Sequence, residues 1–167
     1  MAEAFFFDPR AIIRSLNEHE VRYVLIGALA ATLHGSPLRT GDADICPERG
    51  GANLHRLAQA LRTMDARVFT PGEVQGIEFA CDAKMLASAE VWNLTTRFGR
   101  LDISFTPSGT RGYPDLMRDV VRFEIDEGLV APTASLADIV RTKEAAGRLK
   151  DQAVLPVLRE LLDRSGP

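Results

Sequence analysis

The stretch YVLIGALAATLHGSPLRTGDADICP, residues 23–47, decides the fold. An apolar run ends at Gly27, small helix-favouring residues follow, and a turn containing Gly and Pro leads into DADIC. This order predicts a buried strand, a tight turn at Gly27, a short helix and a second strand. Alternation along the second strand places Asp42 and Asp44 on one face. Two adjacent carboxylates repel each other and are costly to bury without a positive partner, so we expect a cation beside them.

Composition limits the classes of protein to consider. The 167 residues, 46% of them hydrophobic, suffice for one domain, predicted to span 1–167. The net charge of −3 excludes a globally basic nucleic-acid-binding protein but allows a local basic patch. No apolar run is long enough to cross a bilayer, and MAEAFFFDPR lacks the pattern of a signal peptide. We therefore expect a cytoplasmic protein with no membrane partner, and reduced thiols at Cys46 and Cys81.

Periodicity and capping signals predict the other elements. Helices are expected at residues 9–19 and 51–65, and C-terminal helices at about 135–163, with Ser135 as a cap. Further strands are expected near residues 91–96, 100–106 and 120–126, and residues 69–79 are predicted to form a loop or irregular edge strand. The predicted fold class is α+β: a mixed β-sheet flanked by helices, with its core over about 20–130 and a short C-terminal helical tail.

A third aspartate lies in the segment RLDISFT, residues 100–106. Its alternation puts Leu101, Ile103 and Phe105 on a core face and Asp102 on the polar face. Two carboxylates on one strand and a third on another suit Mg²⁺, which prefers oxygen ligands. Two such ions can activate an attacking hydroxyl and hold a triphosphate, while a glycine before a helix lets backbone N–H groups approach phosphate. The combination indicates a nucleotide site.

Each of these residues also has a simpler interpretation. The aspartates of DADIC could form a solvated strand end, and Asp102 could pair with Arg100. Arg39 and Thr40 precede DADIC and are candidates to reach the triphosphate, but SPLRTG is also an ordinary turn. A DxD pair occurs in phosphatases as well, although the haloacid dehalogenase type needs an apolar strand directly before its first Asp, where this chain has SPLRTG.

Over roughly residues 21–151 the sequence resembles the nucleotidyltransferase superfamily that includes DNA polymerase β. The superfamily's glycine and small residue, followed by DxD, match Gly27, Ala28, Asp42 and Asp44, and its third carboxylate matches Asp102 in GRLDIS. Ala28 stands where the family commonly has Ser or Gly, so backbone N–H groups must contact phosphate without a hydroxyl. The resemblance implies a nucleotidyltransferase-like fold.

Within this superfamily the chain is similar to minimal enzymes related to abortive-infection and type IV toxin–antitoxin nucleotidyltransferases. That branch carries a late lysine followed eight positions later by an aspartate, matched by Lys143 and Asp151 in KEAAGRLKD, with Arg148 between them. The resemblance implies that both residues belong to the catalytic set, and that Lys143 and Arg148 neutralise phosphate charge.

The resemblance also implies a reaction. An NMP group would pass from an NTP such as ATP to an acceptor hydroxyl, with Mg²⁺ or Mn²⁺ as cofactor. Asp42 and Asp44 would bind the metal, Asp102 would be the third ligand and a candidate base, and Gly27 and Ala28 would cradle phosphate. The implied acceptor is RNA, specifically a tRNA 3′ end, and the implied partner is a cognate antitoxin protein. A protein or small-molecule acceptor, or a non-catalytic regulatory module, are the alternatives.

Overall fold

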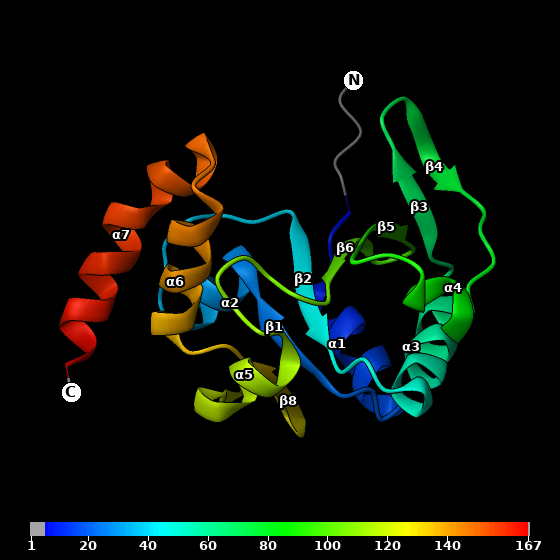
Figure 1. The fold of residues 1–167 in the computed structure, drawn as a ribbon, viewed down its shortest axis with the longest axis horizontal. Helices are drawn as coiled ribbons and strands as arrows, with labels where there is room; N and C mark the ends of the chain where they lie inside the picture. The colour runs from blue at the N-terminus through cyan, green and yellow to red at the C-terminus, as the bar shows by residue number, and fades with distance from the viewer. Residues whose placement is uncertain (1–5, 167) are drawn as a thin grey trace.

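A computed structural model describes residues 6–166 of the chain (Figure 1). In these residues the strands are β1 Tyr23–Ile26, β2 Asp42–Pro47, β3 Arg67–Thr70, β4 Glu73–Ile77, β5 Val91–Thr96, β6 Gly99–Ser104, β7 Val121–Asp126 and β8 Leu129–Thr133. The helices are α1 Pro9–Glu18, α2 Gly27–Leu33, α3 Gly51–Thr63, α4 Ala83–Ala87, α5 Tyr113–Leu116, a 3₁₀ turn Met117–Asp119, α6 Leu136–Ala146 and α7 Leu149–Ser165.

The eight strands form one mixed sheet in the order β4-β3-β5-β6-β2-β1-β8-β7. Strand β2 lies between β1, to which it is antiparallel, and β6, to which it is parallel. The remaining neighbours pair antiparallel except β1 with β8. The predicted fold class, a mixed sheet flanked by helices with a C-terminal helical tail, is confirmed.

The apolar core lies on one side of the two central strands that carry the aspartates. Ala43 and Ile45 of β2 and Leu101 and Ile103 of β6 are fully buried, as alternation predicts. Helices α1 and α3, which contact each other, contribute their apolar faces to the same core. The opposite face of these strands is left free for polar side chains.

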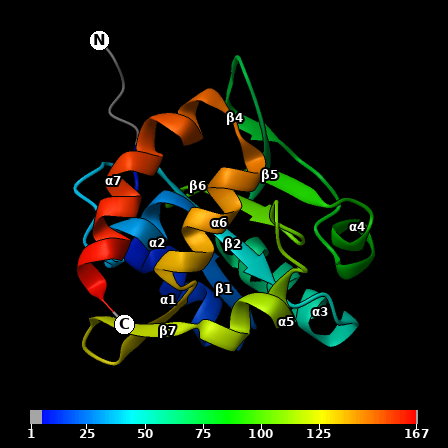
Figure 2. The same ribbon diagram turned by 60° about the vertical axis from the view of Figure 1, so that its left-hand side comes forward.

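The C-terminal helices and the β3–β4 hairpin lie on either side of β2. Helix α6 contacts both α7 and α2, and α2 contacts β2. Figures 1 and 2 show α6 and α7 on one side of the sheet, with the β3–β4 hairpin across from them. The N-terminal end of β2 therefore faces the space between these two parts.

Several element predictions need correction. Of the two alternatives for residues 69–79, the irregular edge strand is confirmed and the loop is not: β4 is the edge strand and pairs with β3 in a hairpin, with a register shift between Val68 and Thr70. Gly27 does not form a separate turn, because α2 begins at Gly27 directly after β1. Strand β8 and helix α5 were not predicted, and α7 extends to Ser165, past the expected end near residue 163.

Both cysteines are free thiols, as predicted. Cys46 is fully buried although it shares the strand face of Asp44, so the polar face of β2 ends at Asp44. Among residues 6–166 no helix combines the length and the apolar character needed to span a membrane.

Candidate active site

The three aspartates highlighted by the sequence lie on adjacent parallel strands. Asp44 of β2 is in register with Asp102 of β6, and Asp42 is in register with Arg100. Neighbouring strands are about 4.8 Å apart, so aspartates in register on one face are close neighbours. Residues 42 and 102, about sixty positions apart in the chain, therefore meet at one place on the sheet.

These carboxylates influence one another's ionisation. Burial raises the pKa of Asp44 to about 7, and the negative charges of Asp42 and Asp102 add to the increase, against the opposing charges of Lys143 and Lys150. Burial also raises the pKa of Asp102, and the Arg100 guanidinium opposes that increase. Burial together with the neighbouring carboxylates therefore disfavours the ionised forms of Asp44 and Asp102 in the metal-free site.

Gly27 determines how closely the β1–α2 junction approaches Asp44. Its φ of +71° favours glycine, and a Cβ built on it would lie 2.5 Å from Asp44 Oδ2. Any side chain here would displace the carboxylate. Ala28 follows in the first turn of α2.

Lys143, Arg148 and Asp151 form a compact group where α6 meets α7. The Asp151 side chain is 1% exposed, with Lys143 Nζ 3.5 Å from its Oδ1 and Arg148 Nε 2.6 Å from its Oδ2. Hydrogen bonds and charge from Arg148, with further charge from Lys143, lower the pKa of Asp151 although burial acts in the opposite direction. Arg148 is the N-cap of α7, and the Asp151 side chain, three residues later, accepts its backbone N–H.

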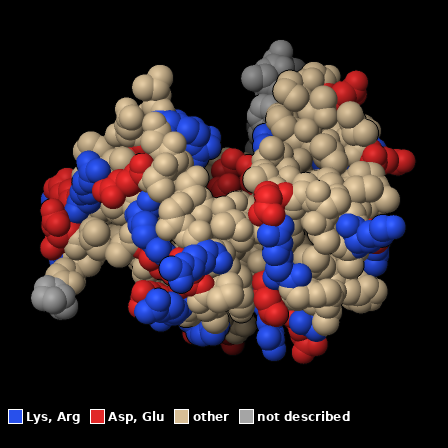
Figure 3. Space-filling model, viewed as in Figure 1, with Lys and Arg blue, Asp and Glu red and all other residues tan. Residues whose placement is uncertain are grey.

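Basic residues at this junction of α6 and α7 interact electrostatically with Asp44. The charges of Lys143 and Lys150 lower the pKa of Asp44, and the charge of Asp44 raises that of Arg148. Figure 3 shows a hollow between the C-terminal helices and the β3–β4 hairpin, with acidic side chains on its floor and basic ones on the helix-side rim. The lysine and arginine that the resemblance singled out thus lie beside the DxD strand.

The two turn residues before β2 are placed differently. The Thr40 hydroxyl lies 3.0 Å from the Asp42 carbonyl oxygen and 3.1 Å from Asp42 Oδ1, so it orients that carboxylate. Arg39 is exposed and makes no hydrogen bond or ion pair with the described part of the chain.

Arg100 is a site residue that the sequence indicated only as an alternative partner of Asp102, and that pairing is observed. Its Nη2 lies 3.2 Å from Asp102 Oδ1, and its guanidinium lies 3.6 Å from the centroid of the Phe69 ring in β3. The contact with Phe69 had no local signal, because it depends on the hairpin that the sequence did not predict. Lys150, whose charge acts on two of the aspartates, also carried no motif.

The donor chemistry of the site fits a divalent cation. Three carboxylates supply the oxygen ligands that Mg²⁺ and Mn²⁺ prefer, and the pKa of Asp44 is raised first by burial and then by the charges of Asp42 and Asp102. Within residues 6–166, however, no three acidic, histidine or cysteine side chains are gathered closely enough to hold a metal ion. Arg100 engages Asp102 instead, so this carboxylate must turn away from Arg100 to become a ligand.

Comparison with known proteins bears on the fold. A crystal structure from Thermotoga maritima, described as a "putative nucleotidyltransferase", matches with a TM-score of 0.55 and 18% sequence identity, over 98% of this chain and 99% of that chain. No protein-family model matches the sequence, and the search of curated proteins gives no significant match. The chain therefore has a nucleotidyltransferase-like fold.

Proposed function

We propose that this protein is a metal-dependent nucleotidyltransferase, which transfers NMP from an NTP to an acceptor hydroxyl and releases pyrophosphate. The observation that carries this proposal is the meeting of Asp42, Asp44 and Asp102 on one sheet face, beside the glycine-led α2 and the basic group of α6 and α7. The nucleotidyltransferase-like fold supports it.

Asp42 and Asp44 are the proposed ligands of Mg²⁺ or Mn²⁺, with Asp102 as third ligand once it leaves Arg100. The bound cation supplies Lewis-acid stabilisation of charge on the triphosphate. The Thr40 hydroxyl holds the Asp42 carboxylate, and Gly27 leaves room for that of Asp44.

In the proposed reaction, the acceptor oxygen forms a bond to the α-phosphorus while the bond from that phosphorus to the pyrophosphate oxygen breaks. The hydroxyl proton passes to a carboxylate, for which Asp102 is the candidate because burial raises its pKa and makes it a stronger base. The departing pyrophosphate takes the electron pair of the broken bond. Lys143 and Arg148 are placed to neutralise that charge.

The triphosphate contacts follow from the same arrangement. Backbone N–H groups at Gly27 and Ala28 are proposed to cradle a phosphate, and exposed Arg39 is free to swing toward it. Asp151 has a supporting part: it is almost fully buried and fixes both Lys143 and Arg148, so its removal would release both cations from their positions.

For the acceptor we propose RNA, specifically a tRNA 3′ end, with the protein acting as a toxin controlled by a cognate antitoxin. This finer proposal is supported by the resemblance of the Lys143 to Asp151 segment to toxin-like nucleotidyltransferases. Basic side chains on the rim of an acidic hollow also suit a phosphate-bearing acceptor (Figure 3). A protein hydroxyl and a small molecule such as an aminoglycoside are the alternative acceptors.

The test is to incubate the protein and Mg²⁺ with each α-labelled NTP and, separately, tRNA, tRNA trimmed at its 3′ end, protein extract and aminoglycosides. We expect label on intact tRNA from wild-type protein and none from Asp44→Asn, with Asp163→Asn as a matched surface control. Label on protein or drug alone would remove the RNA acceptor and keep nucleotidyl transfer. No label on any acceptor from any NTP would contradict the proposal.

One observation favours a second function, a non-catalytic module that uses the same fold to bind a partner. The Arg100 guanidinium is paired with the Asp102 carboxylate, and among residues 6–166 no three potential ligands are close enough to hold a metal ion. Such a module would show no change in melting temperature with millimolar Mg²⁺ and NTP, whereas an enzyme that binds them only when folded is stabilised.

A further inference from the structure

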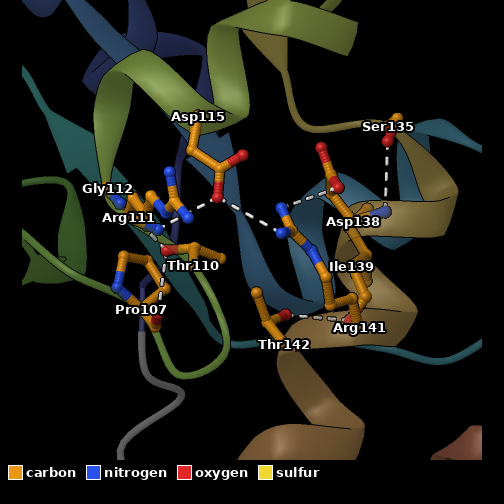
Figure 4. Close-up of polar contacts among 10 residues, drawn as sticks. All are labelled: Pro107, Thr110, Arg111, Gly112, Asp115, Ser135, Asp138, Ile139, Arg141 and Thr142. Atoms are coloured by element: carbon orange, nitrogen blue, oxygen red, sulfur yellow. Dashed lines mark hydrogen bonds and ion pairs between the residues drawn. The ribbon is translucent and has the colours of Figure 1, made fainter.

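A second hollow, of about 600 Å³, lies between the segment after β6 and helix α6. Its lining includes Gly109, Thr110, Arg111, Asp115, Arg118 and Arg141, of which Figure 4 shows Thr110, Arg111, Asp115 and Arg141. None of the three aspartates of the candidate active site lines it. It is therefore a separate feature of the surface.

The walls of this hollow are held together by defined contacts. Asp115 Oδ2 accepts the backbone N–H of Arg111 at 3.0 Å and the Arg141 guanidinium at 3.2 Å. A second Arg141 nitrogen lies 2.9 Å from Asp138 Oδ1, so Arg141 is fixed between two carboxylates, as Figure 4 shows. At Gly109, φ is +75° and a Cβ would lie 2.7 Å from that of Ala145, so only glycine lets the segment pack this closely on α6.

The positive charge of the hollow exceeds what these contacts balance. The three arginines of the lining face two carboxylates, Asp115 in the lining and Asp138 paired with Arg141, which leaves one net positive charge. Arg111 and Arg118 are both exposed, and neither forms an ion pair with another residue among 6–166. The charge of Arg118 nevertheless reaches Asp115, whose pKa is lowered mainly by the Arg111 backbone hydrogen bond and also by Arg141 and Arg118. Two unpaired guanidinium groups thus stand beside a fixed third.

The chemistry of this lining suits an anionic oxygen group such as phosphate. Guanidinium groups bind phosphate oxygens with paired hydrogen bonds. No aromatic side chain lines the hollow, so it offers no surface on which a nucleobase would stack. Figure 3 shows basic side chains gathered over α5 and the adjoining end of α6, on the same face of the molecule as the acidic hollow.

We propose that the hollow lined by Arg111, Arg118 and Arg141 binds a backbone phosphate of a nucleic-acid strand, and so anchors the acceptor away from the point of transfer. This inference rests on the proposed function insofar as the acceptor is a nucleic acid. Arg111 and Arg118 contact the phosphate directly, and Asp115 positions Arg141 beside them. Recognition here is independent of base sequence.

The test measures binding of a fluorescent single-stranded RNA 12-mer to the full chain, without metal or NTP, by fluorescence anisotropy. The double variant Arg111→Ala/Arg118→Ala should weaken RNA binding about tenfold or more, because each hydrogen bond to a charged group contributes up to roughly tenfold in affinity. The slope of log affinity against log salt should fall by about 0.7, for one phosphate contact on a single strand. Arg14→Ala, an exposed arginine of α1 outside the hollow, is the matched control.

Two further measurements keep the proposal falsifiable. Arg118→Glu should weaken RNA binding more than Arg118→Ala, and Arg118→Lys less, with unchanged circular dichroism in all three. Equal RNA affinity in wild type and the double variant would overturn the proposal. So would loss of pyrophosphate binding in the double variant with RNA binding intact, because the hollow would then serve a small phosphate ligand.

The RNA-binding test of this site and the label-transfer test of the proposed function can fail independently. Arginine-dependent RNA binding in a protein that transfers no label would sustain this site and refute the enzyme. Label transfer to tRNA with RNA binding indifferent to both arginines would refute this site and sustain the enzyme.

Discussion

Asp44 and Asp151 are two aspartates for which burial is the strongest influence raising the pKa, yet their pKa values move in opposite directions. Asp151 lies between Lys143 and Arg148, and its pKa falls below the ordinary range. Asp44 lies between Asp42 and Asp102, with lysines too distant to form an ion pair, and its pKa rises to about 7. The difference teaches that one carboxylate is already paired with two cations of the chain, whereas the other is buried beside like charges and is the proposed ligand of a cation.

The largest effect is expected from neutralising Asp44. Asp44→Asn keeps the shape of the side chain but removes the proposed metal ligand, so transfer should fall about 1,000-fold or more. The rate of label incorporation into the acceptor measures this, with Asp163→Asn as the control. Retention of more than a tenth of the wild-type rate would show that Asp44 is not a metal ligand.

The second-largest loss of transfer activity is expected from replacing Lys143. If it neutralises charge on the leaving phosphates, Lys143→Ala should lower kcat by about 100- to 1,000-fold, and Lys143→Glu should lower it further. Lys84→Ala, an exposed lysine of α4, is the matched control. A rate unchanged in Lys143→Ala, with the fold intact, would reduce Lys143 to a structural partner of Asp151.

The pH dependence of stability distinguishes the two aspartates without any assay of activity. Because the folded pKa of Asp44 lies above its unfolded value, stability from this group is full below about pH 4 and is lost as pH rises toward 7. The loss should reach roughly 2 to 4 kcal/mol by pH 8 in metal-free protein. Urea unfolding should therefore find Asp44→Asn more stable than wild type at pH 8, and the two alike at pH 4. Equal free energies of unfolding for wild type and Asp44→Asn at pH 8 would contradict the raised pKa of Asp44.

Asp151 should show the reverse behaviour with a smaller magnitude. Its lowered pKa means that its contribution is present above about pH 4 and is lost as pH falls through the folded pKa. Asp151→Asn should lower the free energy of unfolding at pH 7 by about 1 to 3 kcal/mol, because Arg148 is more than half exposed and its attraction is screened. A variant as stable as wild type at pH 7 would mean that neither cation stabilises the carboxylate.

Much of the central sheet could be predicted from the sequence, because alternation in β2 and β6 is strong and both strands are buried on one face. Leu101 and Ile103 are in the core and Asp102 is opposite, as the pattern predicts. The helix after Ser135 could be predicted equally well, because the Ser135 side chain accepts the Asp138 N–H, a contact within one turn.

The parts that could not be predicted depend on contacts between distant residues. The β3–β4 hairpin has exposed or half-exposed side chains on both faces, so it shows no apolar alternation. The stacking of Arg100 on Phe69 follows from that hairpin, and the reach of Lys150 to Asp44 follows from how α7 meets the sheet. The aspartates were found because their spacing is local, whereas their cationic neighbours come from the tertiary fold.

The central claim is that Asp42, Asp44 and Asp102 bind a divalent cation together with an NTP. Its most direct test is electron paramagnetic resonance of Mn²⁺ titrated into the protein with a non-hydrolysable NTP analogue at pH 8, for wild type, Asp44→Asn and Asp163→Asn. The account predicts protein-dependent loss of the free Mn²⁺ signal, beyond that from the analogue alone, in wild type and Asp163→Asn but not in Asp44→Asn. The same loss of signal in all three proteins, or in none of them, would contradict it.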